Sequence, residues 1–429
     1  MSITRAMYAG VSGLAAESDT LSIVGENIAN TNTVGFKRAR ATFENVLGGA
    51  IGAPDNTGGG VRLGRTQQIF AQGALVNTGQ ATDVALSGDG FFVVNGTVNG
   101  VTGNFYTRAG QLTIRNDGVL VNPQGMAVQG YGPNASGGFD SQVGTLKLST
   151  AQLPPRATST IRATANLDAD ASPPALPFDP QNPGPTSNLS TSMTVYDSLG
   201  KSHVVDLYFT KTDAGTWDVH ALAKGDDVAG GPPGQNVEFA TGRLTFDTAG
   251  ALQDVQWNPS GSISFAGATP NQAIAIDFGT SIAAGGTGLG GTTQFGSASA
   301  VSAQSQDGYD SGDLAGVKID ADGVVSGVYS NGQTVAAGRM AVAKFVSNDG
   351  LGRAGQNLWV ATRESGDAAL GAAGEGGRGA LVAGALEQSN VDIAEQFVEL
   401  IAHQRSFQAN SKTITTADQM LQELMTIKQ

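Results

Sequence analysis

The chain has 429 residues and a formal net charge of −13, from 24 Lys and Arg against 37 Asp and Glu. This acidic balance, without a basic patch, argues against nucleic acid and anionic membranes as partners. The chain contains no cysteine, which excludes disulfides, cysteine-based metal sites and thiol catalysis.

No stretch of about 18 apolar residues is present, so we expect no membrane insertion. Acidic residues at Glu17, Asp19 and Glu26 interrupt the first thirty positions, and no apolar run follows a basic start. This pattern does not match a cleaved signal peptide. If the chain is exported, we expect a route that reads no such signal.

Residues 2–30 predict an amphipathic helix that Ser2 can cap. Glycines at three positions weaken this helix, each by up to about 1 kcal/mol relative to alanine. Its apolar residues recur every seven positions, which predicts a narrow seam facing another helix; they are Met7, Leu14, Leu21 and Ile28.

A polar stretch rich in Asn and Thr ends this helix, and Gly35 there can take a positive φ. Phe36 is expected to be the apolar anchor after the turn. Residues 48–60 hold six glycines and one proline, so we predict a glycine-rich linker over 31–65. A second linker segment is predicted over 366–385.

The period of the apolar residues changes to two from about residue 66, which predicts short β-strands separated by Asp-Gly and Asn-Gly turns. The strand–turn–strand pattern around Asp117-Gly118 returns around Asp322-Gly323. We therefore predict one discontinuous β domain over 66–145 and 304–365. Calcium binding at Asp320 and Asp322 is disfavoured, because the number of ligands and the glycine offset do not fit an EF-hand.

Residues 146–303 are predicted to form an inserted β domain. The insert begins with proline-rich loops and continues with regularly spaced hairpin patterns, such as 193–209 and 244–257. Short strands at this spacing are typical of a β-sandwich or barrel.

The segment from Ser389 to Lys428 contains no glycine and no proline, which predicts a long helix within a terminal segment 386–429. Ser389 and Asn390 can cap it, with Asp392 in capping-box position. Its apolar stripe follows heptad spacing and is widened at neighbouring positions; it comprises Ile393, Phe397, Leu400, Ile401, Phe407, Ile414, Leu421 and Leu424. We expect this stripe and the one within 1–30 to pack as a coiled coil; the alternative is that both lie on a globular core.

No catalytic or ligand-binding pattern is found. Gly200-Lys201-Ser202 lacks the earlier glycine of a phosphate-binding loop, and a predicted strand follows it. The histidines are scattered and show no zinc-ligand spacing; they are His203, His220 and His403. We therefore predict no enzyme activity, no cofactor and no metal.

Two motifs at opposite ends of the chain resemble the signature of the bacterial flagellar rod and hook family. The N-terminal motif consists of Asn27, Asn30, Thr33, Gly35, Phe36 and Lys37. The C-terminal motif covers 386–392 and then 404–412, where Gln404-Arg405-Ser406-Phe407 begins the second part. A generic helix stop explains the first motif equally well when it is taken alone.

The resemblance implies a multidomain α+β fold: terminal helices innermost as a coiled coil, the discontinuous β domain next, and the inserted domain outermost. It further implies a structural subunit that polymerises with itself into the flagellar hook, the curved tube that couples rod to filament. Partners would be the rod, the hook cap, hook–filament junction proteins and the flagellar type III export apparatus, and the location would be extracellular. The alternatives are a distal rod subunit, a secreted β-rich adhesin and a glycan hydrolase.

Overall fold

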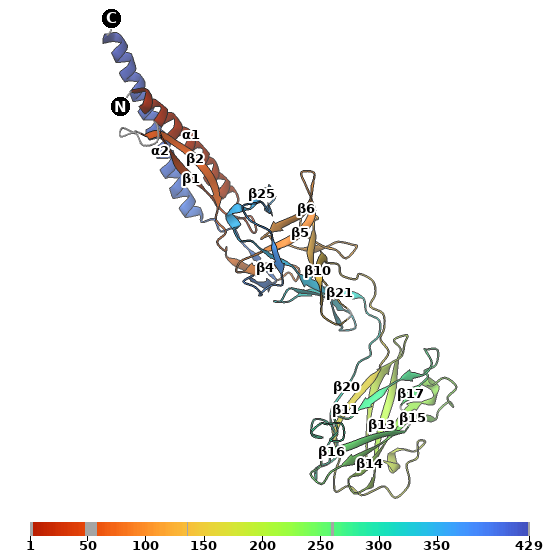
Figure 1. The fold of residues 1–429 in the computed structure, drawn as a ribbon. Coiled ribbons are helices and arrows are strands. Elements are labelled where there is room, and N and C mark those ends of the chain that lie inside the picture. Colours follow the sequence, from red (N-terminus) through yellow and green to blue (C-terminus); the bar gives the residue numbers. More distant parts are fainter. Residues whose placement is uncertain (1–2, 48–57, 135, 259–260, 428–429) are drawn as a thin grey trace. The chain divides into compact units, whose positions relative to one another are not determined.

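The computed structural model describes residues 3–47, 58–134, 136–258 and 261–427, and the chain divides into two compact units (Figure 1). Unit 1 comprises Met1–Thr150, Ala315–Val328 and Thr334–Gln429, and unit 2 comprises Ala151–Leu314 and Tyr329–Gln333. None of the helices in the described ranges is long and apolar enough to cross a membrane.

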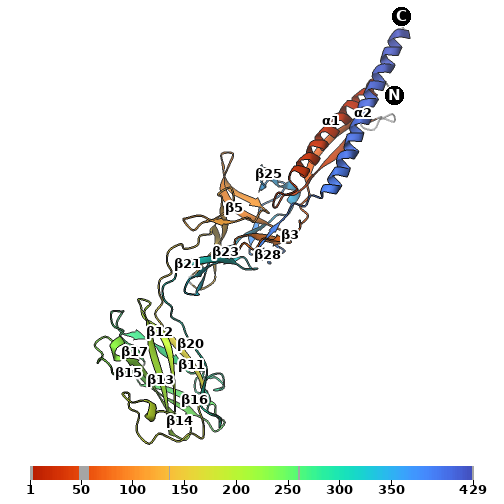
Figure 2. The same ribbon diagram turned by 180° about the vertical axis from the view of Figure 1, so that it is seen from behind.

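Two long helices near the ends of the chain lie side by side in unit 1, as both views show (Figures 1 and 2). Helix α1 spans Ile3–Ala29, and α2 spans Ile393–Ile427. Both lie within the predicted helical segments. The cap of α2 differs from the prediction: the carboxylate of Asp392 accepts the backbone N–H groups of Ala394 and Glu395, whereas Asn390 is engaged elsewhere.

Both segments predicted as linkers contain paired strands instead: β27 (Ala369–Gly371) and β28 (Ala380–Ala383) lie within 366–385, and a hairpin occupies much of 31–65. Strand β1 (Ala39–Leu47) pairs antiparallel with β2 (Gly58–Gln68), and this hairpin contacts α1. The pairing tolerates the glycines of β2, because the hydrogen bonds between the strands are made by backbone N–H and C=O groups, which glycine also carries. The predicted linker core, 48–57, lies outside the described residues.

In the described part of the chain, the remaining strands of unit 1 form one large sheet and two small ones. Neighbouring strands of the large sheet are often far apart in the sequence. β9 from the first half pairs with β23 from the second, and β5 pairs with β24, so the two halves share a sheet. The strands are β3 (Leu75–Asn77), β4 (Val84–Ser87), β5 (Phe91–Val98), β6 (Val101–Thr107), β7 (Thr113–Ile114), β8 (Leu120–Val121), β9 (Ala127–Pro133), β10 (Phe139–Thr145), β21 (Leu314–Ile319), β22 (Val324–Tyr329), β23 (Thr334–Met340), β24 (Val342–Lys344), β25 (Gly352–Gly355), β26 (Leu358–Val360), β27 (Ala369–Gly371), β28 (Ala380–Ala383) and β29 (Ala385–Glu387).

Apolar side chains of both halves fill the interior of unit 1. Phe92 and Leu120 from the first half pack with Val325 and Met340 from the second. The Asp320 turn closes a hairpin, because its carboxylate oxygen accepts the N–H groups of Asp322 and Val324. That arrangement agrees with a hairpin turn rather than a calcium loop.

Unit 2 contains a five-stranded antiparallel meander, β12 to β16, and a three-stranded sheet in the order β19-β11-β20. Residues of both sheets share one core, in which Trp217 and Phe209 are fully buried and Ile161 comes from β11. The strands are β11 (Thr160–Asn166), β12 (Leu189–Tyr196), β13 (Ser202–Asp213), β14 (Thr216–Lys224), β15 (Asn236–Phe246), β16 (Leu252–Asn258), β17 (Ser262–Ile263), β18 (Gln272–Ala273), β19 (Ala275–Asp277) and β20 (Ala300–Gln306).

The unit boundary differs from the expected end of the insert at residue 303. Strand β20 (Ala300–Gln306) pairs with β11 throughout, and the chain stays in unit 2 as far as Leu314. The hairpin tip Tyr329–Gln333 also belongs to unit 2, where Ser330 bonds Asp313. The predicted boundary at 303 falls inside strand β20, whose pairing with β11 continues to Gln306.

Candidate assembly site

Helices α1 and α2 run antiparallel along a seam of polar and small residues. At one end, the Asn27 amide donates to the Gln396 side-chain oxygen over 2.8 Å. In the middle, Nδ1 of His403 lies 2.7 Å from a Glu17 carboxylate oxygen. Farther along, a Cβ on Gly13 would lie 2.7 Å from the Asn410 amide. The glycine therefore lets the two helices approach closely.

The predicted N-terminal stripe flanks this seam. Its four members, Met7, Leu14, Leu21 and Ile28, are all partly buried. The fully buried line of α1 instead consists mainly of small or polar residues: Gly10, Gly13, Ala16, Thr20, Val24 and Asn27. The heptad spacing located the contacting side of α1, but the innermost positions carry little apolar surface.

The predicted C-terminal stripe is divided between two faces of α2. Leu400, Ile414 and Leu421 are partly buried, and Ile414 lies against Gly10 of α1. The others are exposed in the single chain: Ile393, Phe397, Ile401 and Phe407, with exposed fractions of 47%, 49%, 49% and 37%. Val398, which was not part of the predicted stripe, is also exposed, with an exposed fraction of 68%. The side chain of Leu424 is not among those that the structure describes. An apolar face of α2 is thus left uncovered by α1.

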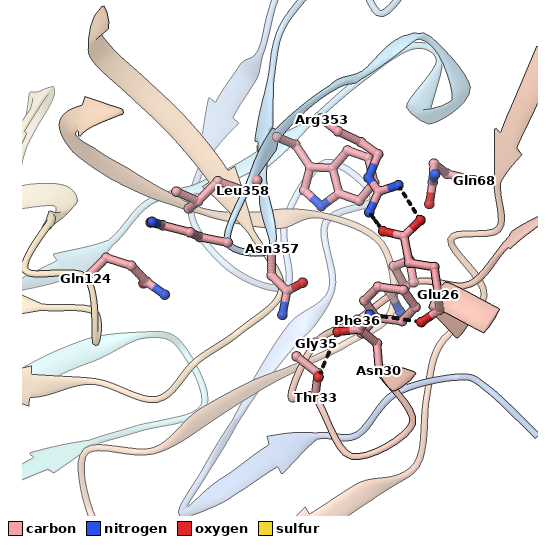
Figure 3. A pocket seen from close by; sticks show the side chains of 14 residues that line it. Glu26, Asn30, Thr33, Gly35, Phe36, Gln68, Gln124, Arg353, Asn357 and Leu358 are labelled. Carbon is pink, nitrogen blue, oxygen red and sulfur yellow. Dashed lines mark hydrogen bonds and ion pairs between the residues drawn. The ribbon is translucent and has the colours of Figure 1, made fainter. Parts of the chain in front are cut away.

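The turn after α1 carries the N-terminal motif. The Asn30 side chain donates to the carbonyl of Glu26, and its oxygen accepts the Thr33 hydroxyl, so the turn is closed by its own side chains (Figure 3). Gly35 has φ 68°, which confirms the predicted positive φ. Phe36 is buried, as expected of the anchor.

A buried ionic cluster joins the two motifs. Nζ of Lys37 lies 2.6 Å from one Glu387 carboxylate oxygen, and the Arg108 guanidinium lies 3.3 Å from the other. Lys37 also donates to the carbonyl of Ala71, and Gly73 donates its N–H to Glu387. Burial lowers the pKa of Lys37 and of Arg108 below their usual values, and the Glu387 carboxylate acts in the opposite direction on both.

Two asparagines fasten the backbone around this cluster. The amide group of Asn27 accepts the N–H of Ala39 and donates to its carbonyl, imitating a strand partner. Asn390 accepts the N–H of Arg38 and donates to the carbonyls of Ile69 and Ala71. The N- and C-terminal motifs therefore hold each other's main chain.

The sequence analysis assigned no role to Glu387 or Arg108, and it assigned Asn390 a helix-capping role that the structure replaces with hydrogen bonds to the main chain at Arg38, Ile69 and Ala71. Glu387 and Asn390 lie within the quoted C-terminal motif, so their position was a usable signal. A glutamate just before the long helix carries the charge opposite to that of the lysine in the N-terminal motif. Arg108 sits at the end of β6 and has no comparable signal in the sequence.

A pocket of about 450 Å³ opens beside the turn (Figure 3). It lies between the end of α1 and the β25–β26 hairpin, and Glu26 and Arg353 form a bidentate ion pair at its wall. The hydrogen bond from Arg353 holds the pKa of Glu26 below its usual range. Trp359, Gln68, Gln124 and Gln356 also line it.

No group of three or more potential metal ligands comes together among the described residues. His203 instead stacks on Phe265 and lies 3.0 Å from the Asp197 carboxylate, while His220 stacks on Phe178 and contacts Glu238. These two histidines have structural partners within unit 2.

Four domain families match successive parts of the chain. They are the flagella basal body rod protein (residues 7–37), the flagellar hook protein FlgE/F/G D1 domain (85–165), the flagellar basal body protein FlaE D2 domain (166–309) and the flagellar basal body rod FlgEFG protein C-terminal domain (382–427). The flagellar hook protein FlgE of Salmonella typhimurium is 35% identical, over 97% of this chain and 98% of its own. That of Treponema pallidum is 33% identical, over 99% of both.

The chain belongs to the flagellar hook protein family. The family predicted from the two terminal motifs is confirmed. Because this is a family of structural flagellar proteins, the predictions of a structural role and of no enzyme activity are confirmed as well. The matches do not favour the rod, adhesin or hydrolase alternatives.

A solved structure of Helicobacter pylori flagellar hook protein FlgE2 resembles this hook-family chain in fold. The TM-score is 0.51 at 15% identity, over 71% of this chain and 98% of that one. At this identity the likeness concerns the fold alone. The present chain is mostly antiparallel β, with two long helices near its ends.

Proposed function

We propose that copies of this chain polymerise through their terminal helices into the hook, a curved helical tube that couples the rod to the filament and transmits torque. The observation that carries the proposal is the apolar face of α2 that α1 leaves uncovered, centred on Phe397, Val398 and Ile401. Burying such a face against neighbouring copies is favourable by about 25 cal/mol per Å² of apolar surface.

The polar seam between α1 and α2 supports the same proposal. Polar residues at core positions of a coiled coil fix its register at a cost in stability. In this chain the Asn27–Gln396 pair is buried between the helices, and the Glu17–His403 pair lies at the partly buried edge of the same seam. The helix pair would then be a coiled coil with a defined register. Its exposed apolar face on α2, rather than the polar seam between the helices, would contact other subunits.

The subunit's surroundings follow from the same role. The tube would contact the rod at one end, and a hook cap and hook–filament junction proteins at the other. It would be assembled outside the cell from subunits passed through the flagellar type III export apparatus. Family membership supports these partners, and none of them is part of the structure.

The proposal is tested by the double variant Phe397→Ser/Ile401→Ser, observed by electron microscopy of the purified protein. Because both side chains are only half buried, the folded monomer should lose no more than about 2 kcal/mol in its free energy of unfolding. Tubes should be lost. Gln419→Ser, at an exposed position of α2 outside the family motif, is the matched control and should form tubes. Normal tubes from the double variant would refute the role of this face.

A further inference from the structure

The sequence contains three Asn-Gly pairs, and they lie in different surroundings; they begin at Asn95, Asn99 and Asn331. Asparagine deamidates most readily before glycine. The glycine nitrogen attacks the side-chain carbonyl carbon of the asparagine, and a glycine has no Cβ to hinder the approach. The reaction requires that the attacking nitrogen and the asparagine side chain are both free to come together. The local structure therefore decides which of the three pairs can react.

Asn99 and Gly100 form the turn of the β5–β6 hairpin, directly beyond the closing strand pair Val98–Val101. Both have positive φ, 48° and 81°, as a type I′ turn requires. Both are exposed, and a Cβ added at Gly100 would meet nothing within 4 Å. Within the described part of the chain, neither the Asn99 side chain nor the Gly100 N–H has a hydrogen-bond partner. Both reacting groups of this pair are therefore free.

The pair Asn331–Gly332 also lies in a hairpin turn, but its reacting groups are held within unit 2. The Asn331 amide donates to the carbonyl of Asp310 over 2.7 Å, and its side-chain oxygen accepts the N–H of Gln333 over 3.0 Å. The attacking nitrogen, that of Gly332, donates its N–H to the carbonyl of Tyr329 over 2.9 Å. These hydrogen bonds must break before the two groups of this pair can meet.

The pair Asn95–Gly96 lies inside strand β5 and not in a turn. Asn95 is paired on both sides, with Asn104 of β6 and Ala127 of β9. Its amide also donates to the side-chain oxygen of Asn104 over 2.8 Å. A Cβ at Gly96 would lie 2.6 Å from Cγ of Met126, so the strand is closely packed at this point. The strand must leave the sheet before this pair can react.

We propose that Asn99 is a site of spontaneous modification, at which the asparagine converts to isoaspartate and aspartate through a cyclic imide, while Asn95 and Asn331 stay intact. The Gly100 nitrogen bonds to Cγ of Asn99, the bond between Cγ and Nδ2 breaks, and the Gly100 proton leaves with the amide nitrogen as ammonia. Water then opens the imide. Opening at the former side-chain carbonyl gives aspartate. Opening at the main-chain carbonyl gives isoaspartate, whose main chain runs through Cβ and Cγ.

Isoaspartate changes the hairpin tip in two ways. It adds a negative charge, and it lengthens the main chain of the turn by one methylene group. A type I′ turn joins paired strand ends through two residues, so the longer chain no longer fits the closing pair Val98–Val101. The next pair, Thr97 and Thr102, whose hydroxyl oxygens lie 2.7 Å apart, then loses its support.

The test is peptide mapping by mass spectrometry of the full-length protein, incubated in mildly alkaline buffer and sampled over time. Isoaspartate and aspartate should accumulate at Asn99. Conversion at Asn95 and Asn331 should be at least about tenfold slower, the factor that corresponds to a local opening free energy of about 1.4 kcal/mol. In denaturant, where this protection is lost, the three sites should react at similar rates. Similar rates at the three sites of the folded protein, or aspartate without isoaspartate at Asn99, would overturn the inference.

Two variants separate the parts of the inference. Asn99→Gln should show no conversion at this position, because its longer side chain closes a less favourable ring; conversion at the native rate would contradict the imide. Freshly prepared Asn99→Asp carries the added charge without the longer main chain. Amide hydrogen exchange over 97–102 should therefore match the native protein in this variant and be faster in the isoaspartate fraction of aged native protein. Equal exchange in the aged and fresh native protein would overturn the predicted change at the hairpin tip.

Discussion

Lys37 and Glu387 are 350 positions apart in the chain, yet Nζ of the lysine lies 2.6 Å from the glutamate oxygen, and both side chains are fully buried. Arg108 completes the cluster from the end of β6. Replacing such a cluster by apolar groups can be neutral, but removing one member leaves uncompensated buried charge. The two family motifs are therefore interdependent, because each supplies one sign of charge.

Removing the shared acid is expected to destabilise unit 1 most. Glu387→Gln leaves Lys37 and Arg108 buried without a counter-charge, and we expect a loss of about 3–5 kcal/mol in the free energy of unfolding. Glu44→Gln, which breaks an exposed pair with Arg62, should cost less than about 1 kcal/mol. Denaturant unfolding monitored by hydrogen exchange of unit 1 peptides measures both. Equal losses would contradict the assigned importance of burial.

Two glycines near the end of α1 should respond oppositely to alanine. At Gly35, with φ 68°, a Cβ would lie 2.6 Å from the backbone nitrogen of Ala109, so Gly35→Ala should cost more than the roughly 1–2 kcal/mol of a left-handed backbone alone. Gly25 is an exposed helix position where an added Cβ would meet nothing within 4 Å, so Gly25→Ala should stabilise by about 1 kcal/mol. Thermal unfolding of the two variants, measured side by side, checks both signs.

Asn27 should be much less replaceable than its neighbour Asn32. Asn27→Ala leaves the backbone N–H and C=O of Ala39 and the side-chain oxygen of Gln396 without the Asn27 partner, at about 1–3 kcal/mol for each group left buried. Asn32 is exposed in the same turn, and Asn32→Ala should stay within about 0.5 kcal/mol. Amide hydrogen exchange in α1 and β1 measures the loss of stability in each variant. If Asn27→Ala left the protection of Ala39 unchanged, the strand-like role of this side chain would be wrong.

Unit 2 should lose stability in acid through Asp197. Burial by itself raises the pKa of this carboxyl, but hydrogen bonds from His203 and from the N–H groups of Lys201 and Leu199 together hold it below its usual value. A carboxyl whose folded pKa is depressed contributes stability above its unfolded pKa of about 3.9 and loses it as pH falls through the lower folded value.

The measurement is the melting temperature of unit 2 between pH 7 and pH 2. We expect Asp197→Asn to be less stable than the native chain at pH 7, with the difference shrinking below about pH 4. Asp213→Asn, at the exposed end of β13, should track the native curve. A constant difference between Asp197→Asn and the native protein over the whole range would show that the carboxylate's charge is not the cause.

The sequence by itself determined the features that depend on nearby residues. The helix limits follow from apolar spacing and from the lack of glycine and proline over 389–428, and the hairpins follow from Asp-Gly turns. Gly35 was recognised as a positive-φ position because side-chain sterics are a local property. The family was also readable, since its two motifs are short and contiguous.

Tertiary structure alone decided what depends on distant pairing and burial. The spacing of the C-terminal stripe could not say that Ile414 contacts α1 at Gly10 while Phe397 stays exposed, because that division depends on where the glycines and polar residues of α1 meet α2. Composition also could not show that the predicted linker 31–65 contains the paired strands β1 and β2, because the pairing is made by backbone hydrogen bonds, which glycine-rich segments can form as well. The charge cluster at Glu387 required the fold itself, because only burial turns three ordinary charged residues into one interdependent group.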